Sequence, residues 1–313
     1  MPDSICFSTR FKKSVSIIGG LHARLTQGLR GLLWALLPAL LLSGCSALKL
    51  GYNNAPELSY WWLDSFLDFN DPQSTQVRVE LAGLQAWHRQ NELPRYVTML
   101  QKLQRLAPAA VTPGQLCEAY GELKPRLQAF LDQAEPGIAA LAPSLSPEQL
   151  LHLQRQLDKR SEKWRSEWLT VTLDERNARR VKQLVERAEM LYGNLEEPQK
   201  ARLRERVAAL PFDVDLRERE SQRRHRDMLQ TLRQVQGSAP TDTSARTALD
   251  AWLARAVDSP DSAYRKQQDV ATQATCQTLA ALHNSTTAAQ RLAALKTLQS
   301  YEADAASLLA PGR

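Results

Sequence analysis

Prolines divide most of this chain into segments of about 10 to 24 residues, and within these segments the apolar side chains recur with a helical period. One such stripe consists of Leu150, Leu153, Leu157, Trp164 and Trp168, and similar stripes run over 181–191 and 292–301. Proline ends a helix or opens the next one, and no stretch alternates between apolar and polar residues for long enough to predict a strand. The sequence therefore predicts an all-α, multi-helix bundle.

The composition agrees with a helical, globular protein. Charged residues make up 24% of the 313 residues and aromatic residues 6%, which excludes collagen-like chains, disulfide-dense mini-proteins and polytopic membrane proteins. The chain has only 13 glycines, fewer than the turns of a nucleotide-binding α/β enzyme or a β-sandwich normally use.

The first 45 residues have the pattern of a lipoprotein signal. Five basic residues and one acidic residue precede an apolar run from Leu32 to Leu42, which is too short to span a membrane as a helix. The run leads into Leu-Ser-Gly-Cys, ending at Cys45, which resembles the bacterial lipobox. The resemblance implies that a signal peptide, 1–44, is cleaved, that Cys45 carries lipid, and that the protein faces the periplasm. A buried cysteine after an ordinary core helix is the alternative.

The residue after this cysteine bears on which membrane holds the anchor. Ser46 resembles the pattern of lipoproteins that are exported to the outer membrane, whereas aspartate would favour retention in the inner membrane. We therefore expect the outer membrane. Cleavage removes five basic residues and one acidic residue and so lowers the net charge from +6 to +2. This balance gives no support to nucleic-acid binding.

Two cysteines remain beyond the signal, Cys117 and Cys276. An even pair in an oxidising compartment favours a disulfide, which would close a loop of about 160 residues and constrain the unfolded chain. The alternative is two unpaired cysteines that are buried on different helices.

A short element recurs where helices are expected to begin. It consists of an apolar residue, a capping residue, two further residues and glutamine, and it occurs at 111–115, 145–149 and 195–199, with a looser copy at 286–290. These residues predict capping boxes, in which the cap side chain accepts from the N3 amide and the glutamine reaches back to the cap amide. The copy at 195–199 lacks the Ser or Thr cap.

The same elements resemble the LTxxQ motif of small periplasmic stress proteins of the CpxP and Spy type, most closely at Leu145–Gln149. The resemblance implies a helical protein that binds misfolded proteins or a sensor kinase. Ordinary helix capping explains the same residues without that function.

The segment after the signal is rich in aromatic residues, with six of them between Tyr52 and Phe69. Gly-Tyr-Asn-Asn-Ala at 51–55 leads into Tyr-Trp-Trp-Leu-Asp at 60–64, and behind a lipobox this order resembles an uncharacterised family of proteobacterial lipoproteins. The resemblance implies a helical fold and a place in the cell envelope, but no activity.

We expect part of this segment to contact a partner protein or the membrane, because tyrosine and tryptophan combine an apolar body with a polar tip. The candidate residues are Tyr52, Tyr60, Trp61, Trp62 and Asp64. Alternatively, the aromatic side chains pack the first helix onto the bundle. Asp64 and Asp68 lie one turn apart, and we expect caps or ion pairs from them rather than a carboxylate site.

Motifs of known enzyme classes are missing from the sequence, which contains no HExxH, CxxC, GxSxG or glycine-rich phosphate loop. The histidines at 88, 152, 225 and 283 have no second histidine or cysteine at ligand spacing. We therefore predict no catalysis, no metal, no cofactor and no small-molecule substrate. The segment 217–227 contains five basic and three acidic residues, which predicts a solvated helix face or, alternatively, contact with anionic lipid head groups.

Together these features predict a non-enzymatic, lipid-anchored protein that binds another envelope protein in a chaperone-like or stress-related role. A structural or assembly factor of the outer membrane or cell wall, docking one fixed partner, is the alternative. We expect four parts in the chain: the signal peptide at 1–44, the aromatic-rich anchored segment at 45–70, a main helical domain at 71–236, and a C-terminal helical segment at 245–313 packed on the main body.

Overall fold

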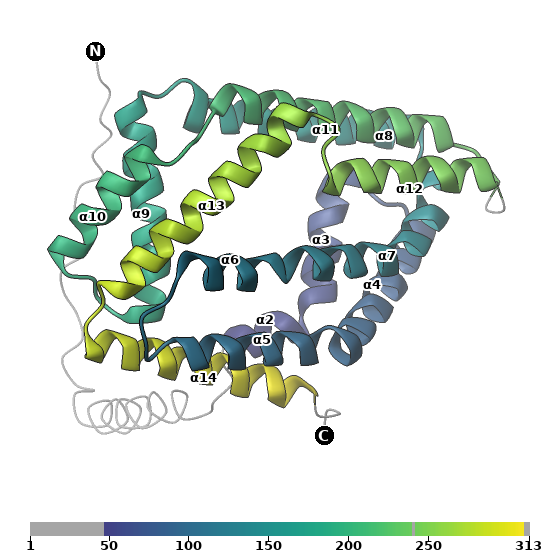
Figure 1. Cartoon of the computed structure of the whole chain (residues 1–313). Coiled ribbons are helices and arrows are strands. Elements are labelled where there is room, and N and C mark those ends of the chain that lie inside the picture. Colours follow the sequence, from purple (N-terminus) through teal and green to yellow (C-terminus); the bar gives the residue numbers. More distant parts are fainter. Residues whose placement is uncertain (1–46, 240–241, 310–313) are drawn as a thin grey trace, which may run out of the picture. The chain divides into compact units, whose positions relative to one another are not determined.

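The computed structural model describes residues 47–239 and 242–309 (Figure 1). These residues are helical almost throughout and contain no strand, which confirms the predicted all-α class. The proposed signal peptide, Cys45 and Ser46 lie outside the described residues. Contacts place Ala47–Arg313 in one compact unit, and the finer division at 70, 236 and 245 stays a prediction.

The helices follow one another with short connections. A first short helix, α2 (Ala47–Asn53), precedes a set made of α3 (Ala55–Leu67), α4 (Asp71–Asn91), α5 (Leu93–Leu106), α6 (Pro113–Gly121), α7 (Leu123–Leu141) and α8 (Pro147–Trp164). A 3₁₀ turn, η1 (Ala142–Ser144), precedes α8, and a π-helical turn, η2 (Arg165–Leu169), follows it. The next set is α9 (Leu173–Tyr192), α10 (Glu197–Ala209), α11 (Val214–Val235), α12 (Thr243–Val257), α13 (Ser262–Asn284) and α14 (Ala288–Leu309).

The two sets of helices repeat the same contacts. Helix α3 packs on α4 and α8, just as α9 packs on α10 and α14, and α4 contacts α7 as α10 contacts α13. The remaining helices cross to the other set: α5 packs along α14 while α11 packs along α8, and α6 packs on α13 while α12 packs on α7 (Figure 1). The unit is therefore built from two similar halves, α3–α8 and α9–α14, that exchange their third and fourth helices.

Within the first half, the N-termini of α4 and α8 meet through two glutamines. Gln73 and Gln149 each occupy the third position of a helix, and the side-chain Oε1 of each accepts from the backbone N–H of its own cap residue. Their amides also bond to each other, with Nε2···Oε1 distances of 2.7 and 3.2 Å. Finally, Gln73 Nε2 donates to the Ser144 carbonyl and Gln149 Nε2 to the Asp68 carbonyl, both at 2.9 Å.

The second half repeats this crossed pair at the N-termini of α10 and α14. Gln199 and Gln290 bond to each other at 2.8 and 2.9 Å. Gln199 Nε2 donates to the Ser285 carbonyl and Gln290 Nε2 to the Asn194 carbonyl, again both at 2.9 Å. In all four cases the accepting carbonyl belongs to the residue five positions before the partner glutamine. All four glutamines are buried.

The capping boxes predicted at 111–115 and 145–149 are confirmed, but the elements differ in what else they do. The box at Gln115 makes no cross-pair and its bonds stay within its own helix start. Gln73, the partner of Gln149, belongs to an Asn70 box that was not predicted, although residues 69–73 have the same order of an apolar residue, a cap, two further residues and glutamine. On α8, α10 and α14 a buried apolar stripe continues down the helix from the crossed glutamine, as at Leu153 and Leu157, whereas on α4 Val77 is the one buried apolar residue.

The expectation of a solvated face at 217–227 is wrong for one side of α11. Glu220 is 3% exposed and accepts from Arg223 Nε at 2.8 Å and from Arg224 Nε at 2.6 Å. Burial alone would raise the pKa of Glu220, but hydrogen bonds from Arg223, Arg224 and Ser259 outweigh it and lower the pKa to about 2. Glu220 is therefore the buried member of a charge network on one side of α11, which also includes the ion pair of Asp227 with Arg255. Arg217, Arg219 and Arg226 of the same helix remain exposed.

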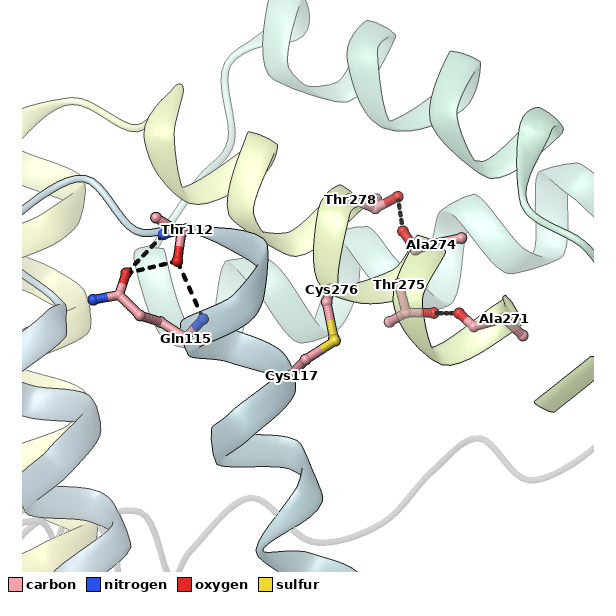
Figure 2. The surroundings of a disulfide bond; sticks show 8 residues. All are labelled: Thr112, Gln115, Cys117, Ala271, Ala274, Thr275, Cys276 and Thr278. Carbon is pink, nitrogen blue, oxygen red and sulfur yellow. Dashed lines mark hydrogen bonds between the residues drawn. A yellow bond between two sulfur atoms is a disulfide. The ribbon is translucent and has the colours of Figure 1, made fainter. Parts of the chain in front are cut away.

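Cys117 of α6 and Cys276 of α13 form a disulfide with a Cα–Cα distance of 5.5 Å (Figure 2). Figure 2 also shows the capping box of Thr112 and Gln115 close to this bond, at the start of the same helix. Because α6 belongs to the first half and α13 to the second, the disulfide joins the two halves covalently.

The crossed pairs predict unequal effects for two similar substitutions. Gln149→Ala removes a cap bond and also leaves buried partners unsatisfied, so we expect it to lower the free energy of unfolding by about 3 kcal/mol. Gln115→Ala removes only a cap bond and should cost about 1 kcal/mol. Urea unfolding of the two variants measures the difference, and equal losses would show that the cross-pair contributes nothing.

The disulfide predicts that oxidised protein starting at Ser46 exposes no thiol when it is denatured, and two after reduction. Replacing both cysteines by alanine should lower the free energy of unfolding by up to about 5 kcal/mol, because the unfolded chain loses the constraint of a long loop. A thiol-reactive mass tag and urea unfolding provide the two measurements. Two tagged thiols without reduction would contradict the pairing.

Candidate functional site

Two of the predicted contact residues serve the packing of α3 instead. Tyr60 is 7% exposed, and its hydroxyl donates to Ser74 Oγ at 3.0 Å while the guanidinium of Arg78 lies 3.6 Å from its ring centroid. The expectation that Tyr60 contacts a partner or the membrane is therefore wrong, because its helix face packs against α4. Asp64 Oδ1 accepts from the backbone N–H of Phe69 at 2.9 Å, so this carboxylate closes the C-terminal turn of α3.

Tyr52 lies in a half-buried cluster that connects α2 to α4 and α5. Its hydroxyl is 2.9 Å from His88 Nδ1, and the His88 ring stacks on Tyr96 with centroids 5.7 Å apart. Burial raises the pKa of Tyr52 and lowers the pKa of His88. Both shifts favour the neutral forms, and the tautomer of His88 decides whether the hydroxyl or Nδ1 donates. Tyr52 therefore acts mainly in packing.

The two tryptophans are exposed. Leu58, Trp61 and Trp62 are 50%, 59% and 55% exposed, and their spacing of three and four residues places them on one face of α3. The Trp62 ring contacts Phe66 with centroids 5.0 Å apart. The guanidinium of Arg160, on α8, lies 5.3 Å from the Phe66 ring and 6.0 Å from the Trp62 ring. We refer to Leu58, Trp61 and Trp62 as the α3 surface.

A second candidate site is a groove of about 850 Å³ that is lined by residues of α6, α7, α12 and α13. Tyr120, Leu123 and Leu127 form a helical stripe along one wall, and they are 58%, 38% and 50% exposed. Val257 and Tyr264 are apolar residues of the other wall. We refer to this feature as the α6–α13 groove. Cys117 of the disulfide is part of its lining.

Several charged groups of the groove are already paired within the protein. Lys124 Nζ lies 3.6 Å from Asp258 Oδ1, Arg224 Nε donates to Glu220 at 2.6 Å, and Arg265 donates to the Ser259 carbonyl. The exposed apolar side chains of the stripe have no such partner and remain open to solvent. The groove therefore combines an exposed apolar stripe on one wall with a mostly polar wall from α13, which includes Gln268, Asp269 and Gln273. Within 47–239 and 242–309, no group of three or more His, Cys, Asp or Glu side chains could hold a metal ion.

Sequence patterns revealed the exposed tryptophans but missed the groove. Its walls come from segments more than 120 residues apart, which only the crossing of α6 onto α13 brings together. One signal was available, since Tyr120, Leu123 and Leu127 have helical spacing. Leu58 was also missed, although it shares a face with the tryptophans. None of the helices in the described ranges is both long and apolar enough to cross a membrane.

The comparisons with known proteins identify a family and nothing further. A family model described as a family of unknown function, DUF6279, matches residues 65–241. No curated protein and no solved structure matches the chain. The match runs from the last turn of α3 to the start of α12 and covers more than half of the chain. The expectation of an uncharacterised family is thereby confirmed: the chain belongs to DUF6279, a family of unknown function.

Proposed function

We propose that this protein is a lipid-anchored, non-enzymatic component of the bacterial cell envelope that faces the periplasm and binds unfolded segments of other proteins. The lipobox-like residues ending at Cys45 support the anchor, and Ser46 supports the outer membrane. The observation that carries the binding activity is the α6–α13 groove, where an exposed apolar stripe runs along one wall.

The chemistry of the groove suits an apolar segment of variable sequence. Tyr120, Leu123 and Leu127 are large side chains that remain more than a third exposed in the folded protein. Covering such surface is favourable by about 25 cal/mol per Å² and does not depend on direction. A ligand therefore needs apolar side chains rather than one particular sequence, which is the requirement for a chaperone-like protein.

The crossed capping boxes have a structural role. The elements at 145–149, 195–199 and 286–290, which resemble the LTxxQ motif, hold the N-termini of α8, α10 and α14 to their partner helices, whereas the element at 111–115 makes no crossed pair. The resemblance to periplasmic stress proteins therefore rests on residues with a structural role in this chain. Such a role keeps the helices in place while a groove between other helices remains open.

The pairing of the charged groups in the groove supports binding rather than catalysis. Lys124, Arg224 and Arg265 are occupied by partners of the protein itself. General acid–base or nucleophilic catalysis needs groups that converge on the substrate, and the apolar stripe supplies none.

The proposal predicts that the protein starting at Ser46, with its disulfide intact, suppresses the aggregation of an unfolded protein at a molar ratio near one. Leu123→Asp should weaken this suppression about five-fold or more, because a charge replaces apolar contact worth about 1 kcal/mol or more. Light scattering of chemically denatured citrate synthase, diluted into buffer without reductant so that the disulfide stays intact, measures the effect as a function of added protein.

A matched control is Leu173→Asp. Leu173 is also the first residue of a helix, α9, and is also exposed, but it does not line the groove. Acidic residues are tolerated at a helix N-terminus, so both variants should fold, and Leu173→Asp should suppress aggregation like the unaltered protein. No suppression at a several-fold excess, or equal losses in both variants, would reject the groove as the binding site.

A further inference from the structure

The binding function proposed for the α6–α13 groove does not involve the α3 surface. We propose that Leu58, Trp61 and Trp62 lie in the interfacial region of the membrane that holds the anchor, where they contact lipid head groups and the upper acyl chains. This inference rests on the lipid anchor of the proposed function. It adds a contact that fixes how the anchored protein stands on the membrane.

The short stretch of chain between Cys45 and α3 keeps the α3 surface close to the proposed lipid. Helix α2 begins at Ala47, two residues after Cys45, and two extended residues span at most about 7 Å. The seven residues of α2 add about 10 Å. With the connection and the first turns of α3, the backbone of Trp61 lies no farther than roughly 35 Å from Cys45 along the chain. A lipid on Cys45 therefore keeps the α3 surface within reach of the same bilayer.

The residue types of the α3 surface suit the interface between membrane and water. Tryptophan is enriched at the membrane–water interface, because its ring is apolar and its indole N–H is polar. Trp61 and Trp62 stand side by side on one helix face with Leu58, and all three are at least half exposed. Arg160 lies next to the Trp62 and Phe66 rings. A guanidinium at that position can pair with lipid phosphates while the rings enter the interface.

The area of the α3 surface also favours a membrane over a protein partner. Two half-exposed tryptophans and one half-exposed leucine offer roughly 300 Å², whereas a stable protein interface covers about 800 Å² on each partner. The α3 surface is therefore small for a dedicated protein partner. It is sufficient for a membrane contact, because the lipid anchor supplies the affinity and the surface only has to orient the protein.

The orientation of α3 is set by residues that the surface does not use. Tyr60 fixes the opposite side of the helix through Ser74 and Arg78. Asp64 closes the last turn through the N–H of Phe69. The tryptophans therefore project from a helix that is held in place, and their exposure follows from the fold.

The test uses the full chain, expressed with its signal, purified from membranes and reconstituted into phosphatidylethanolamine–phosphatidylglycerol vesicles. Trp61→Cys receives the environment-sensitive fluorophore NBD, and Met190→Cys on α9, an exposed apolar position, is the matched control. The new cysteine is the only reactive thiol when Cys45 carries lipid and Cys117 is bonded to Cys276. Lipids with a nitroxide near the head group serve as quenchers.

We expect at least two-fold quenching of NBD at position 61 and little at position 190. Equal quenching at the two positions would overturn the membrane contact. The membrane contact would also be overturned if position 61 showed no quenching in vesicles and crosslinked to a single protein in cells. That result would assign the α3 surface to a partner protein.

Mass spectrometry of the same preparations separates the two proposals. A lipid-bearing Cys45 without quenching at position 61 overturns this inference and leaves the anchored protein standing. The absence of lipid on Cys45 overturns both. Trp61→Glu combined with Trp62→Glu provides an independent check, since both side chains are exposed and the fold should persist. The doubly substituted protein should keep its lipid but show reduced quenching of NBD placed at Leu58→Cys.

Discussion

A buried helix N-terminus leaves backbone N–H groups that need acceptors, and this unit buries four such N-termini in two pairs. At each of these N-termini one glutamine side-chain amide both supplies an acceptor and binds the partner helix. Its oxygen accepts from the cap of its own helix, and its nitrogen donates to a carbonyl in the connection before the partner helix. Gln73 with Gln149, and Gln199 with Gln290, perform this exchange. Glutamate could supply the acceptor but not the donor, and it is found in the uncrossed, exposed box of Thr172 and Glu175.

The two crossed glutamine pairs, which we refer to as the first and second joints, also explain why the unit is built from exchanged halves. Each joint holds two helices of one half together, α4 with α8 in the first half and α10 with α14 in the second. Between these helices in the sequence lie α5 and α6, and α11 and α12, which pack on the other half. The repetition is not complete. At the contact of α6 with α13 the chain has a disulfide and the groove, whereas at the equivalent contact of α12 with α7 it has an ion pair of Arg246 with Glu135, 3.4 Å apart. The candidate binding site therefore occurs once.

The helical class, the breaks and several capping boxes could be predicted from the sequence, because these features depend on neighbours within four residues. The crossed pairs could not, since Gln73 and Gln149 are separated by 76 positions and local capping explains each glutamine separately. For the same reason the charges of α11 suggested a solvated face. Whether Glu220 meets water depends in part on Ser259, which arrives from the loop that follows α12.

Tyr60 and Trp61 show the same limit at the candidate site. Both have the composition of an interface residue, and only the position of α4 decides that one is covered while the other is exposed. A helical period could assign them to different faces, but it could not say which face meets the bundle. The exposed fraction of each aromatic side chain is thus a property of the packing around α3.

Helix α3 connects the proposed membrane contact to the first joint. Its C-cap residue is Asp68, whose backbone has a left-handed φ of 50° and whose carbonyl accepts from Gln149. The same glutamine holds the N-terminus of α8 to that of α4. An α3 that is fixed at a membrane would therefore fix α4 and α8 with it, through hydrogen bonds that are buried and shielded from water. The second joint is linked to the proposed anchor by a different route, because α14, which begins at Gln290's joint, packs on α2, where Lys49 Nζ lies 3.5 Å from Asp304 Oδ1. Both joints are therefore held relative to the N-terminal end, the first through buried hydrogen bonds and the second through the packing of α14 on α2.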